Sequence, residues 1–366
     1  MQERTYLDSN ATSILRPCVR NSMAKAFDLV GNPSSVHYFG RAARYHIDLA
    51  REQVASLVGV LPSQVIFTSG GTESNNLAIN GINSQITIAS SIEHASVLKA
   101  CLSGHFLPVD KDGVVNINRL PGLIPKNSLK TLVSIMLANN ETGVIQPIKE
   151  TAEIANSLGA IIHTDAVQAA GKIPIDFDAL NVHCMSISAH KLGGPSGVGA
   201  LIIKEGLDIR SLLGGGGQEN SYRPGTQNTL GIIGFGAAAE AARKEISEFE
   251  KLSNLRNKLE LRVKAMARVK IFGSGAERLP NTSLLGFPNI SSETLVLALD
   301  LEGIAVSSGA ACASGKVDGN HVLFAMGAKE EAIRVSFGWS SNEEDIDAFM
   351  RAFEKIYPRL LNGLAA

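Results

Sequence analysis

Short apolar runs, each the length of one strand, alternate with segments of helical periodicity through about the first two thirds of the chain. Runs that are apolar at every position suit strands buried on both faces of a sheet. Strand, helix, strand repetition predicts a mostly parallel sheet covered by helices, which is an α/β fold. The predicted strands are residues 86–89, 131–136, 160–163, 184–188 and 199–203, and the predicted helices include residues 72–83 and 148–158.

The pattern changes after about residue 245, where a long amphipathic helix over residues 249–267 is followed by shorter elements. Strands are predicted at residues 269–272, 283–287 and 333–337, and helices at residues 294–299 and 343–353. A chain of 366 residues exceeds the usual size of one domain. We therefore expect a large domain over residues 15–245, a smaller α+β domain from residues 1–14 and 246–366, and a site between them.

Charge and cysteine content exclude several classes of protein. The 34 Lys and Arg residues against 35 Asp and Glu residues give a net charge of -1, which argues against non-specific binding to nucleic acid or to an anionic membrane. The first six residues lack the apolar core of a signal peptide, and no run of about 18 apolar residues is present. None of the four cysteines forms a C-x-x-C pair, so the sequence indicates no metal and no disulfide framework. We expect a reduced, cytoplasmic protein.

Lys191 directly follows a strand of buried type, in the segment SISAHKLGGP at residues 186–195. Burying an ammonium group without a partner is costly, so a lysine at this place is unusual. A desolvated lysine has a lowered pKa and forms imines with carbonyl compounds, which offers a functional reason for the position. The alternative is a structural lysine that extends its ammonium into solvent at the end of the strand.

Two further segments carry polar groups after predicted strands. The segment SGGTESNN at residues 69–76 follows an apolar run, and its glycines and helix start suit a phosphate group, although a plain helix N-terminus with Thr72 and Glu73 in its first turn is the alternative. It is not a Walker loop, because no Gly-Lys-Ser/Thr follows. Asp165 ends the strand at 160–163 and could pair with a pyridinium nitrogen, the alternative being a helix-capping aspartate. A phosphate cradle, a ring-nitrogen partner and an imine-forming lysine are the groups that pyridoxal 5′-phosphate (PLP) requires.

A series of motifs in order along nearly the whole chain resembles the class V, fold-type I PLP enzymes, and most closely the cysteine desulfurases of the NifS/IscS type. The resemblance implies a PLP-dependent transferase fold with a mostly parallel, seven-stranded sheet in the large domain. The motifs are YLDSNAT (6–12), GNPSSVH (31–37), SIEH (91–94), NNETG (139–143), RPGT (223–226), SSGAAC (307–312) and IRVS (333–336).

The resemblance also implies a role for each matching residue. Lys191 is expected to hold PLP as a Schiff base, Asp165 to pair with its pyridine nitrogen, and His94 to stack on its ring and move protons, although a histidine that caps the next helix is the alternative. The positions expected to contact the phosphate, the ring hydroxyl or the substrate are Gly71, Thr72, Ser188, His190, Gln168 and Asn140. Thr226 matches a residue that reaches the phosphate of the neighbouring subunit, which implies a homodimer.

Cys312 and Arg334 point to the substrate. Cys312 lies in a segment of small and polar residues, 307–316, whose composition suits an exposed thiol, although composition by itself favours an unreactive loop position. The resemblance implies that the Cys312 thiolate attacks the sulfur of the substrate. Arg334 matches an arginine that clamps the substrate carboxylate with the help of Asn10, the alternative being a surface salt bridge. We expect Cys18, Cys101 and Cys184 to be packing residues.

The resemblance therefore predicts a cysteine desulfurase that converts L-cysteine to L-alanine and leaves a persulfide on Cys312. The sulfur would pass to an acceptor or scaffold protein, for example in iron–sulfur cluster biogenesis or tRNA thiolation. Ala310 stands where this family commonly has serine, which leaves open which acceptor docks there. The alternatives are a selenocysteine lyase or another class V enzyme such as an aminotransferase, and a PLP-fold protein without activity. An aminotransferase would not need Cys312.

Overall fold

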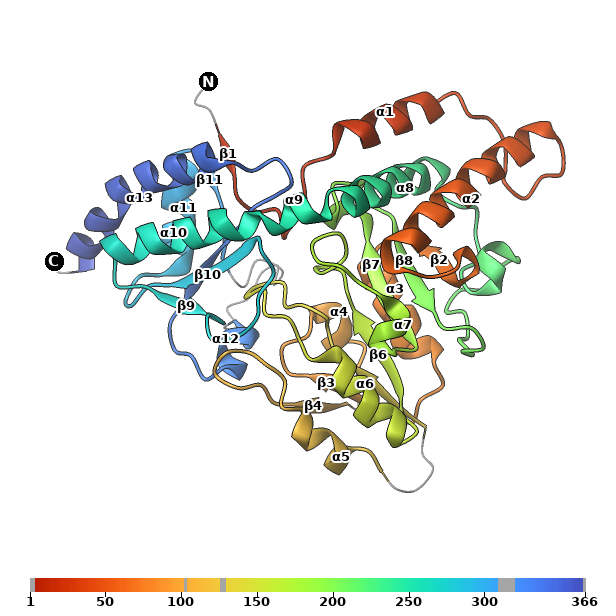
Figure 1. Cartoon of the computed structure of the whole chain (residues 1–366), viewed down its shortest axis with the longest axis horizontal. Coiled ribbons are helices and arrows are strands. Elements are labelled where there is room, and N and C mark those ends of the chain that lie inside the picture. Colours follow the sequence, from red (N-terminus) through yellow and green to blue (C-terminus); the bar gives the residue numbers. More distant parts are fainter. Residues whose placement is uncertain (1–3, 102–103, 126–129, 309–319, 365–366) are drawn as a thin grey trace.

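The computed structural model describes residues 4–101, 104–125, 130–308 and 320–364 (Figure 1). Within them, seven strands form one sheet in the order β2-β8-β7-β6-β5-β3-β4. Every neighbouring pair is parallel except those of β8, which runs antiparallel to both β2 and β7. The predicted mostly parallel sheet is thus confirmed. Its strands are β2 (Val65–Thr68), β3 (Ile86–Ser90), β4 (His105–Leu107), β5 (Thr131–Ser134), β6 (Ile161–Asp165), β7 (Cys184–Ser188) and β8 (Gly199–Ile203).

Helices cover both faces of this sheet, as the apolar strands require. Along β2, Val65 and Phe67 belong to one cluster of buried side chains, whereas Ile66 between them belongs to a cluster on the other face. The first face is covered by α1 (Pro17–Ala26), α2 (Tyr38–Val58), α5 (Leu120–Leu123), α6 (Ile148–Ser157), α7 (Phe177–Leu180) and α8 (Thr229–Lys244), and the second by α3 (Gly71–Gly81) and α4 (Ala95–Leu98). Short 3₁₀ turns occur at Pro62–Gln64, Ile117–Arg119, Ala189–Lys191 and Gln218–Ser221.

A second, antiparallel sheet has the order β12-β13-β10-β9 in the described part of the chain. Its strands are β9 (Lys270–Phe272), β10 (Thr282–Gly286), β12 (Ser307–Ser308) and β13 (Ala332–Ser336), which confirms the three strands predicted here to within one or two residues. Around it lie α9 (Ile246–Glu250), α10 (Leu252–Met266), α11 (Ser292–Leu301), α12 (His321–Ala325) and α13 (Glu343–Leu364). A separate apolar cluster, which includes Phe287, Phe349 and Phe353, fills this part of the molecule.

The helix predicted over residues 249–267 is confirmed over most of its length by α10, but it is interrupted at Lys251, where α9 ends and α10 begins. The Lys251 amide bonds Glu248 O, three residues back, so the helical turn tightens at this point. With α8 before them, these helices run along one line from the large sheet to the small one (Figure 1).

The N-terminal segment joins the two sheets. Strand β1 (Thr5–Tyr6) pairs in parallel with β11 (Ile304–Ala305), and Leu7 belongs to the apolar cluster of the small sheet. The chain then reaches the large sheet, where the Ser13 amide bonds His190 O at 2.8 Å. Because β8 is antiparallel to both of its neighbours, β2 points the same way as β7. Six strands therefore direct their carboxyl ends to one edge, and the candidate site lies there.

Candidate active site

Lys191 lies in the 3₁₀ turn that directly follows β7. Its Nζ donates to the backbone oxygens of Asn10, at 2.6 Å, and Ala11, at 2.8 Å. The turn itself is held by the same N-terminal segment, because the Arg16 amide bonds Gly193 O at 2.9 Å. The ammonium is therefore directed towards the N-terminal segment rather than extended into solvent, and it stands at the carboxyl edge of the large sheet.

The turn between β2 and α3 brings several backbone N–H groups together at the start of α3. Gly70 has φ 154°, a conformation that favours glycine, and it stands at the N-cap of α3. A Cβ atom on Gly71 would lie 2.7 Å from Val167 Cγ2 and 3.7 Å from Ser188 Cβ, so the helix start packs closely against the end of β7. The first N–H groups of a helix have no partner within it. Gly71 and Thr72 supply such groups here.

The Ser188 hydroxyl lies beside this helix start. Ser188 is 2% exposed, and its Oγ has no hydrogen-bond partner among the described residues. A buried hydroxyl without a partner is rare and calls for an explanation. A bound anion at the start of α3 would supply the missing acceptor. The alternative of a plain helix N-terminus also holds, because Thr72 and Glu73 lie in the first turn of α3, and Glu73 Oε2 accepts from the Ser69 amide at 2.8 Å.

Asp165 ends β6 with both carboxylate oxygens held. Oδ2 accepts from Asn75 Nδ2 at 2.7 Å, and Oδ1 accepts from the Val167 amide at 2.9 Å. The capping alternative thus applies to a turn and not to a helix. The sequence analysis quoted Asn75 only as part of a motif and missed its contact with Asp165. Asn75 lies one helical turn after Gly71, and this spacing was the one signal that could have placed it at the site.

His94 belongs to a chain of hydrogen bonds that begins at Asp165. Asn75 Nδ2 also donates to Ser96 Oγ, at 2.8 Å, and Ser96 Oγ lies 2.7 Å from His94 Nδ1. The Ser96 amide donates to the same Nδ1, so the ring caps α4, as the structural alternative proposed. Nδ1 is therefore an acceptor and the ring proton lies on Nε2. Burial lowers the pKa of His94, opposed by Asp165 and reinforced by Lys191 and His321, so the imidazole is neutral near pH 7.

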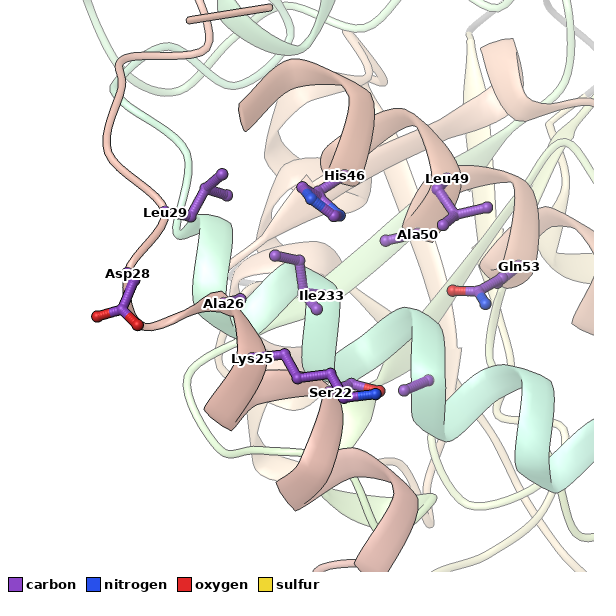
Figure 2. Close-up of a pocket in the computed structure, with 11 residues that line it drawn as sticks. Ser22, Lys25, Ala26, Asp28, Leu29, His46, Leu49, Ala50, Gln53 and Ile233 are labelled. Carbon is purple, nitrogen blue, oxygen red and sulfur yellow. The ribbon is translucent and has the colours of Figure 1, made fainter. Parts of the chain in front are cut away.

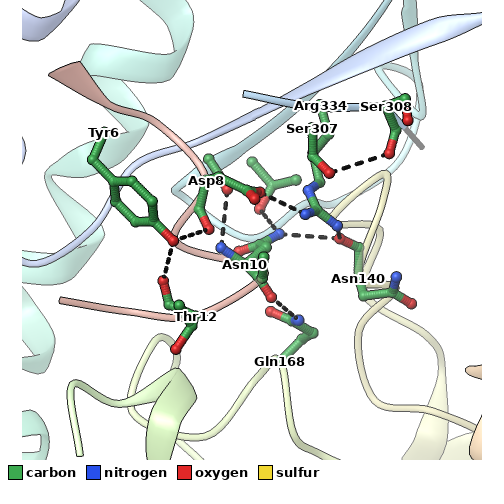
Figure 3. Close-up of polar contacts among 12 residues, drawn as sticks. Tyr6, Asp8, Asn10, Thr12, Asn140, Gln168, Ser307, Ser308 and Arg334 are labelled. Atoms are coloured by element: carbon green, nitrogen blue, oxygen red, sulfur yellow. Dashed lines mark hydrogen bonds and ion pairs between the residues drawn. The ribbon is translucent and has the colours of Figure 1, made fainter. Parts of the chain in front are cut away.

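Arg334 lies on β13 and faces the site from the small sheet (Figure 3). The residue is 4% exposed. Its Nη2 donates to Asp8 Oδ1 at 2.7 Å and its Nη1 to Asn140 O at 3.1 Å, while Nε has no partner within the described chain. The salt bridge of the structural alternative exists, but it is buried and not on the surface. Asp8 was missed because its only signal was its place in the first motif.

Asn10 joins both sheets at the centre of the site. Its Nδ2 donates to Asn140 O at 3.2 Å and to Thr282 Oγ1 at 2.9 Å. Its backbone oxygen accepts from Gln168 Nε2 at 2.9 Å (Figure 3). The same oxygen accepts from Lys191 Nζ. The structure therefore brings together Asn10, Asn140, Gln168, Lys191 and Arg334, which the sequence analysis singled out.

His190 precedes Lys191 and contacts the N-terminal segment. Its Nδ1 lies 3.2 Å from Thr12 Oγ1. Burial first, and then Lys191 and Lys172, lower the pKa of His190 to about 4. The ring is thus neutral, and it can act as a hydrogen-bond donor or acceptor without adding charge.

The remaining predicted residues do not belong to the group described above. Cys312 falls outside the described residues and is not placed, and Thr226 is exposed in an irregular segment. Cys101 and Cys184 are buried packing residues, and burial raises the pKa of the Cys101 thiol to about 12. The packing interpretation of Cys18 is wrong, because this residue lies on the outer face of α1 and is exposed. Over the described ranges, no cluster of His, Cys, Asp and Glu is arranged to hold a metal, and no helix is long and apolar enough to cross a membrane.

Comparison with known proteins agrees with this arrangement. The family model described as Aminotransferase class-V matches residues 5–349. A curated protein of Dictyoglomus turgidum named "Cysteine desulfurase IscS" is 42% identical over 98% of this chain and 96% of its own length. "Cysteine desulfurase NifS" of Azotobacter vinelandii is 39% identical over 98% of this chain and 93% of its own. The crystal structure of a NifS-like protein from Rickettsia africae superposes with a TM-score of 0.91 at 38% identity, covering 97% of this chain and all of that one, which confirms the expected fold class.

Proposed function

Because this chain belongs to the class-V aminotransferase family, we propose that it is a PLP-dependent cysteine desulfurase, which converts L-cysteine to L-alanine and a protein persulfide. The observation that carries this proposal is the position of Lys191, after β7 and next to the buried, unpartnered Ser188 hydroxyl. The hydroxyl, the start of α3 and the lysine together suit a phosphorylated aldehyde.

The residues present fit PLP. Gly71, Thr72, Ser188 and His190 would hold its phosphate, and Lys191 would hold it covalently. Asp165, which Asn75 fixes at 2.7 Å, would pair with the ring nitrogen. Gln168, Asn140 and His94 would contact the ring and its hydroxyl. When bound, PLP supplies an electron sink that stabilises negative charge on the substrate Cα.

Protons are moved by two side chains of known position. Lys191 Nζ is the base that takes the α-proton of the substrate. His94 is kept neutral by burial and carries its proton on Nε2, so it can exchange a proton with the substrate sulfur. Because Ser96 and Asn75 connect His94 to Asp165, the tautomer of the ring is fixed by the same contacts that fix the carboxylate.

Arg334 is the residue proposed to bind the substrate carboxylate, with Asn10 and Asn140 beside it. Asp8 and Asn140 O hold the guanidinium from one side, and Nε is left with an unused N–H. A guanidinium fixed in this way is prepared to donate to a carboxylate without losing further side-chain entropy.

Cys312 is the proposed sulfur carrier. Its thiolate attacks the substrate sulfur, an S–S bond forms, and the substrate Cβ–S bond breaks. The Cβ atom keeps the electron pair and takes a proton, so the products are alanine and a persulfide. The persulfide then passes to a sulfur-acceptor protein, in iron–sulfur cluster biogenesis or another sulfur-delivery route. A free thiol of this kind requires a reducing compartment, which supports a cytoplasmic location.

The homodimer is proposed from an apolar surface on α2 and on the segment that joins α1 to α2. Phe27, Val30, Val36, Tyr38, Phe39, Tyr45 and Leu49 are all exposed there. A cavity of about 390 Å³ lies beside them, where α1, α2 and α8 meet and Lys25, His46 and Ile233 line its wall (Figure 2). Large exposed apolar surfaces mark interfaces. Among the described residues, Thr226 makes no hydrogen bond to the proposed phosphate site of its own chain. In the homodimer it would reach the phosphate bound by the other subunit.

The division into domains is likewise a proposal. Residues 15–245 would form the PLP-binding domain, and residues 1–14 with 246–366 the smaller domain that carries Cys312. Separate apolar clusters on the large and the small sheet support this division, since Leu7 packs with the small sheet and Val19 with the large one.

The deciding experiment follows alanine and sulfide together in purified protein supplied with PLP, L-cysteine and a thiol reductant. Equal amounts of both products, lost in Cys312→Ser but retained in Cys18→Ser, would support desulfuration through Cys312. Activity that survives in Cys312→Ser and converts L-cysteine to its keto acid would instead identify an aminotransferase. A strong preference for selenocysteine over L-cysteine would identify a selenocysteine lyase.

A further inference from the structure

Lys172 is a buried lysine without a countercharge. It lies in the turn that follows β6 and is 2% exposed. Its Nζ donates to Asn10 Oδ1 and to Gln168 Oε1, both at 2.8 Å, and no carboxylate of the described residues forms an ion pair with it. Buried charges are normally paired, because an unpaired ammonium is costly to desolvate. The sequence analysis did not single out this residue.

The contacts of Lys172 determine how two amides are oriented. A lysine ammonium only donates, so the atoms that face it must be oxygens. With its Oε1 on Lys172, Gln168 must direct Nε2 to the backbone oxygen of Asn10. With its Oδ1 on Lys172 and on Asn281 Nδ2, at 3.1 Å, Asn10 must direct its own Nδ2 to Asn140 O and Thr282 Oγ1.

The Gln168 amide and Lys191 meet at the backbone oxygen of Asn10. The backbone oxygen of Asn10 accepts from Gln168 Nε2 at 2.9 Å and from Lys191 Nζ at 2.6 Å. Lys172 therefore acts on Lys191 through one intervening residue. Two ammonium groups this near each other also repel, so a positive charge on either lysine disfavours one on the other.

We propose that Lys172 is a positioning residue of the desulfurase reaction, which fixes the amides of Asn10 and Gln168 and, by its charge, favours the uncharged form of the nitrogen on Lys191. This inference rests on the proposed function. Burial is the first cause that lowers the pKa of Lys172 well below its usual range, and the positive charges of Lys191 and Arg334 add to it. The two amide oxygens that accept from Lys172 Nζ oppose this effect and favour the protonated form on which the charge effect depends.

Two variants separate the hydrogen bonds from the charge. Lys172→Met removes both, whereas Lys172→Gln removes the charge and keeps a donor. The protein is loaded with PLP, and the visible absorption of the cofactor on Lys191 is titrated with pH. Both variants should raise the apparent pKa of the Lys191 nitrogen by about one unit, because a neighbouring positive charge is lost. Only Lys172→Met should lower kcat/KM for L-cysteine by about tenfold or more, because only it leaves the amides unheld.

A destabilised control excludes a general effect of lost stability. Phe353→Leu lowers packing in the cluster of the small sheet and should leave the titration unchanged. Titration curves of both Lys172 variants that coincide with wild type would overturn the inference, as would the same shift in Phe353→Leu. If Lys172→Met does not fold, the titration of Lys172→Gln decides. Wild-type protein that forms no alanine would instead overturn the proposed function, and this inference with it.

Discussion

Asn75 donates from one nitrogen to both Asp165 Oδ2, at 2.7 Å, and Ser96 Oγ, at 2.8 Å. One amide, that of Asn75, thus holds both the Asp165 carboxylate, which is proposed to pair with the ring nitrogen, and Ser96, which orients His94. Asn75→Ala removes both contacts, and we expect the affinity for PLP to fall about tenfold or more, since a hydrogen bond to a charged group contributes roughly 1.5–3 kcal/mol. Equilibrium dialysis of PLP measures this change. Asn76→Ala is the matched control, because Asn76 is half-buried and, within the described chain, its side chain forms hydrogen bonds only within α3. An equal loss there would contradict the assignment.

Ser188→Ala tests the role of the Ser188 hydroxyl at the proposed phosphate site. Because Ser188 Oγ has no partner among the described residues, its removal should leave the unfolding temperature of the PLP-free protein unchanged. The affinity for PLP should fall by about tenfold, the effect of one lost hydrogen bond. Ser186→Ala on the same strand is the control: Ser186 Oγ lies 2.9 Å from His163 Nε2, and its removal should destabilise the PLP-free protein by about 1 kcal/mol. A clear loss of stability in Ser188→Ala would contradict this prediction.

Glu93 should make the protein less stable as the pH rises. Burial raises the pKa of Glu93 to about 8, and Asp165 adds to the rise, while Ser90 and the Met136 amide oppose it. Between the unfolded value near 4.5 and about 8, the unfolded state releases a proton that the folded state keeps, so stability is lost through this window. Glu93→Gln removes the effect, and its advantage over wild type should grow by up to about 1.4 kcal/mol per pH unit. Denaturant unfolding at a series of pH values measures it.

The control for this experiment is Glu150→Gln, a change of the same kind at an exposed position of α6. Its stability difference from wild type should not vary over the same pH range. A constant difference for Glu93→Gln would show that Glu93 is ionised in the folded protein.

Arg334→Lys tests the proposed contact with the substrate carboxylate. A lysine keeps the charge but loses the planar fork that can hold Asp8, Asn140 O and a carboxylate at once. We expect the KM for L-cysteine to rise by at least about tenfold, with a smaller change in kcat. Arg278→Lys is the comparison, because Arg278 is also buried and pairs with Glu260, at 2.8 Å. Arg278→Lys should be less stable than wild type and keep the wild-type KM. A raised KM in both variants would contradict a specific role of Arg334 in binding the substrate carboxylate.

The strands and the edge on which the site lies could be predicted from the sequence. Strands β7 and β8 have the predicted bounds, because a short apolar run between turn residues has few alternatives. The polar residues that end such runs, including Ser188 and Asp165, must meet where parallel strands end. The roles of the remaining site residues came from the resemblance to a family, and they stay predictions.

The partners of these residues could not be predicted, because they come from distant parts of the chain. Lys172 reads as an ordinary charged residue in a turn, and only the folded chain shows that Asn10 covers it. Asp8 likewise meets Arg334 across 326 residues. The break between α9 and α10 is local, but the sequence gives no sign of it. It is one tightened turn, and the residues around Lys251 are all compatible with a continuous helix.

The N-terminal strand that begins on the small sheet affects the order in which the protein can be assembled during synthesis. Leu7 packs in a cluster completed by Phe353, and Asn10 bonds Ser336 Oγ, so the segment around residues 7–10 cannot be packed until residues more distant along the chain have been synthesised. The large sheet can form as soon as residue 203 has emerged. The N-terminal segment, however, is not fixed over the turn that carries Lys191 until the small sheet has formed. The nascent chain would therefore carry an incomplete site around Lys191 until the small sheet has formed, and stable capture of the proposed PLP would follow that step.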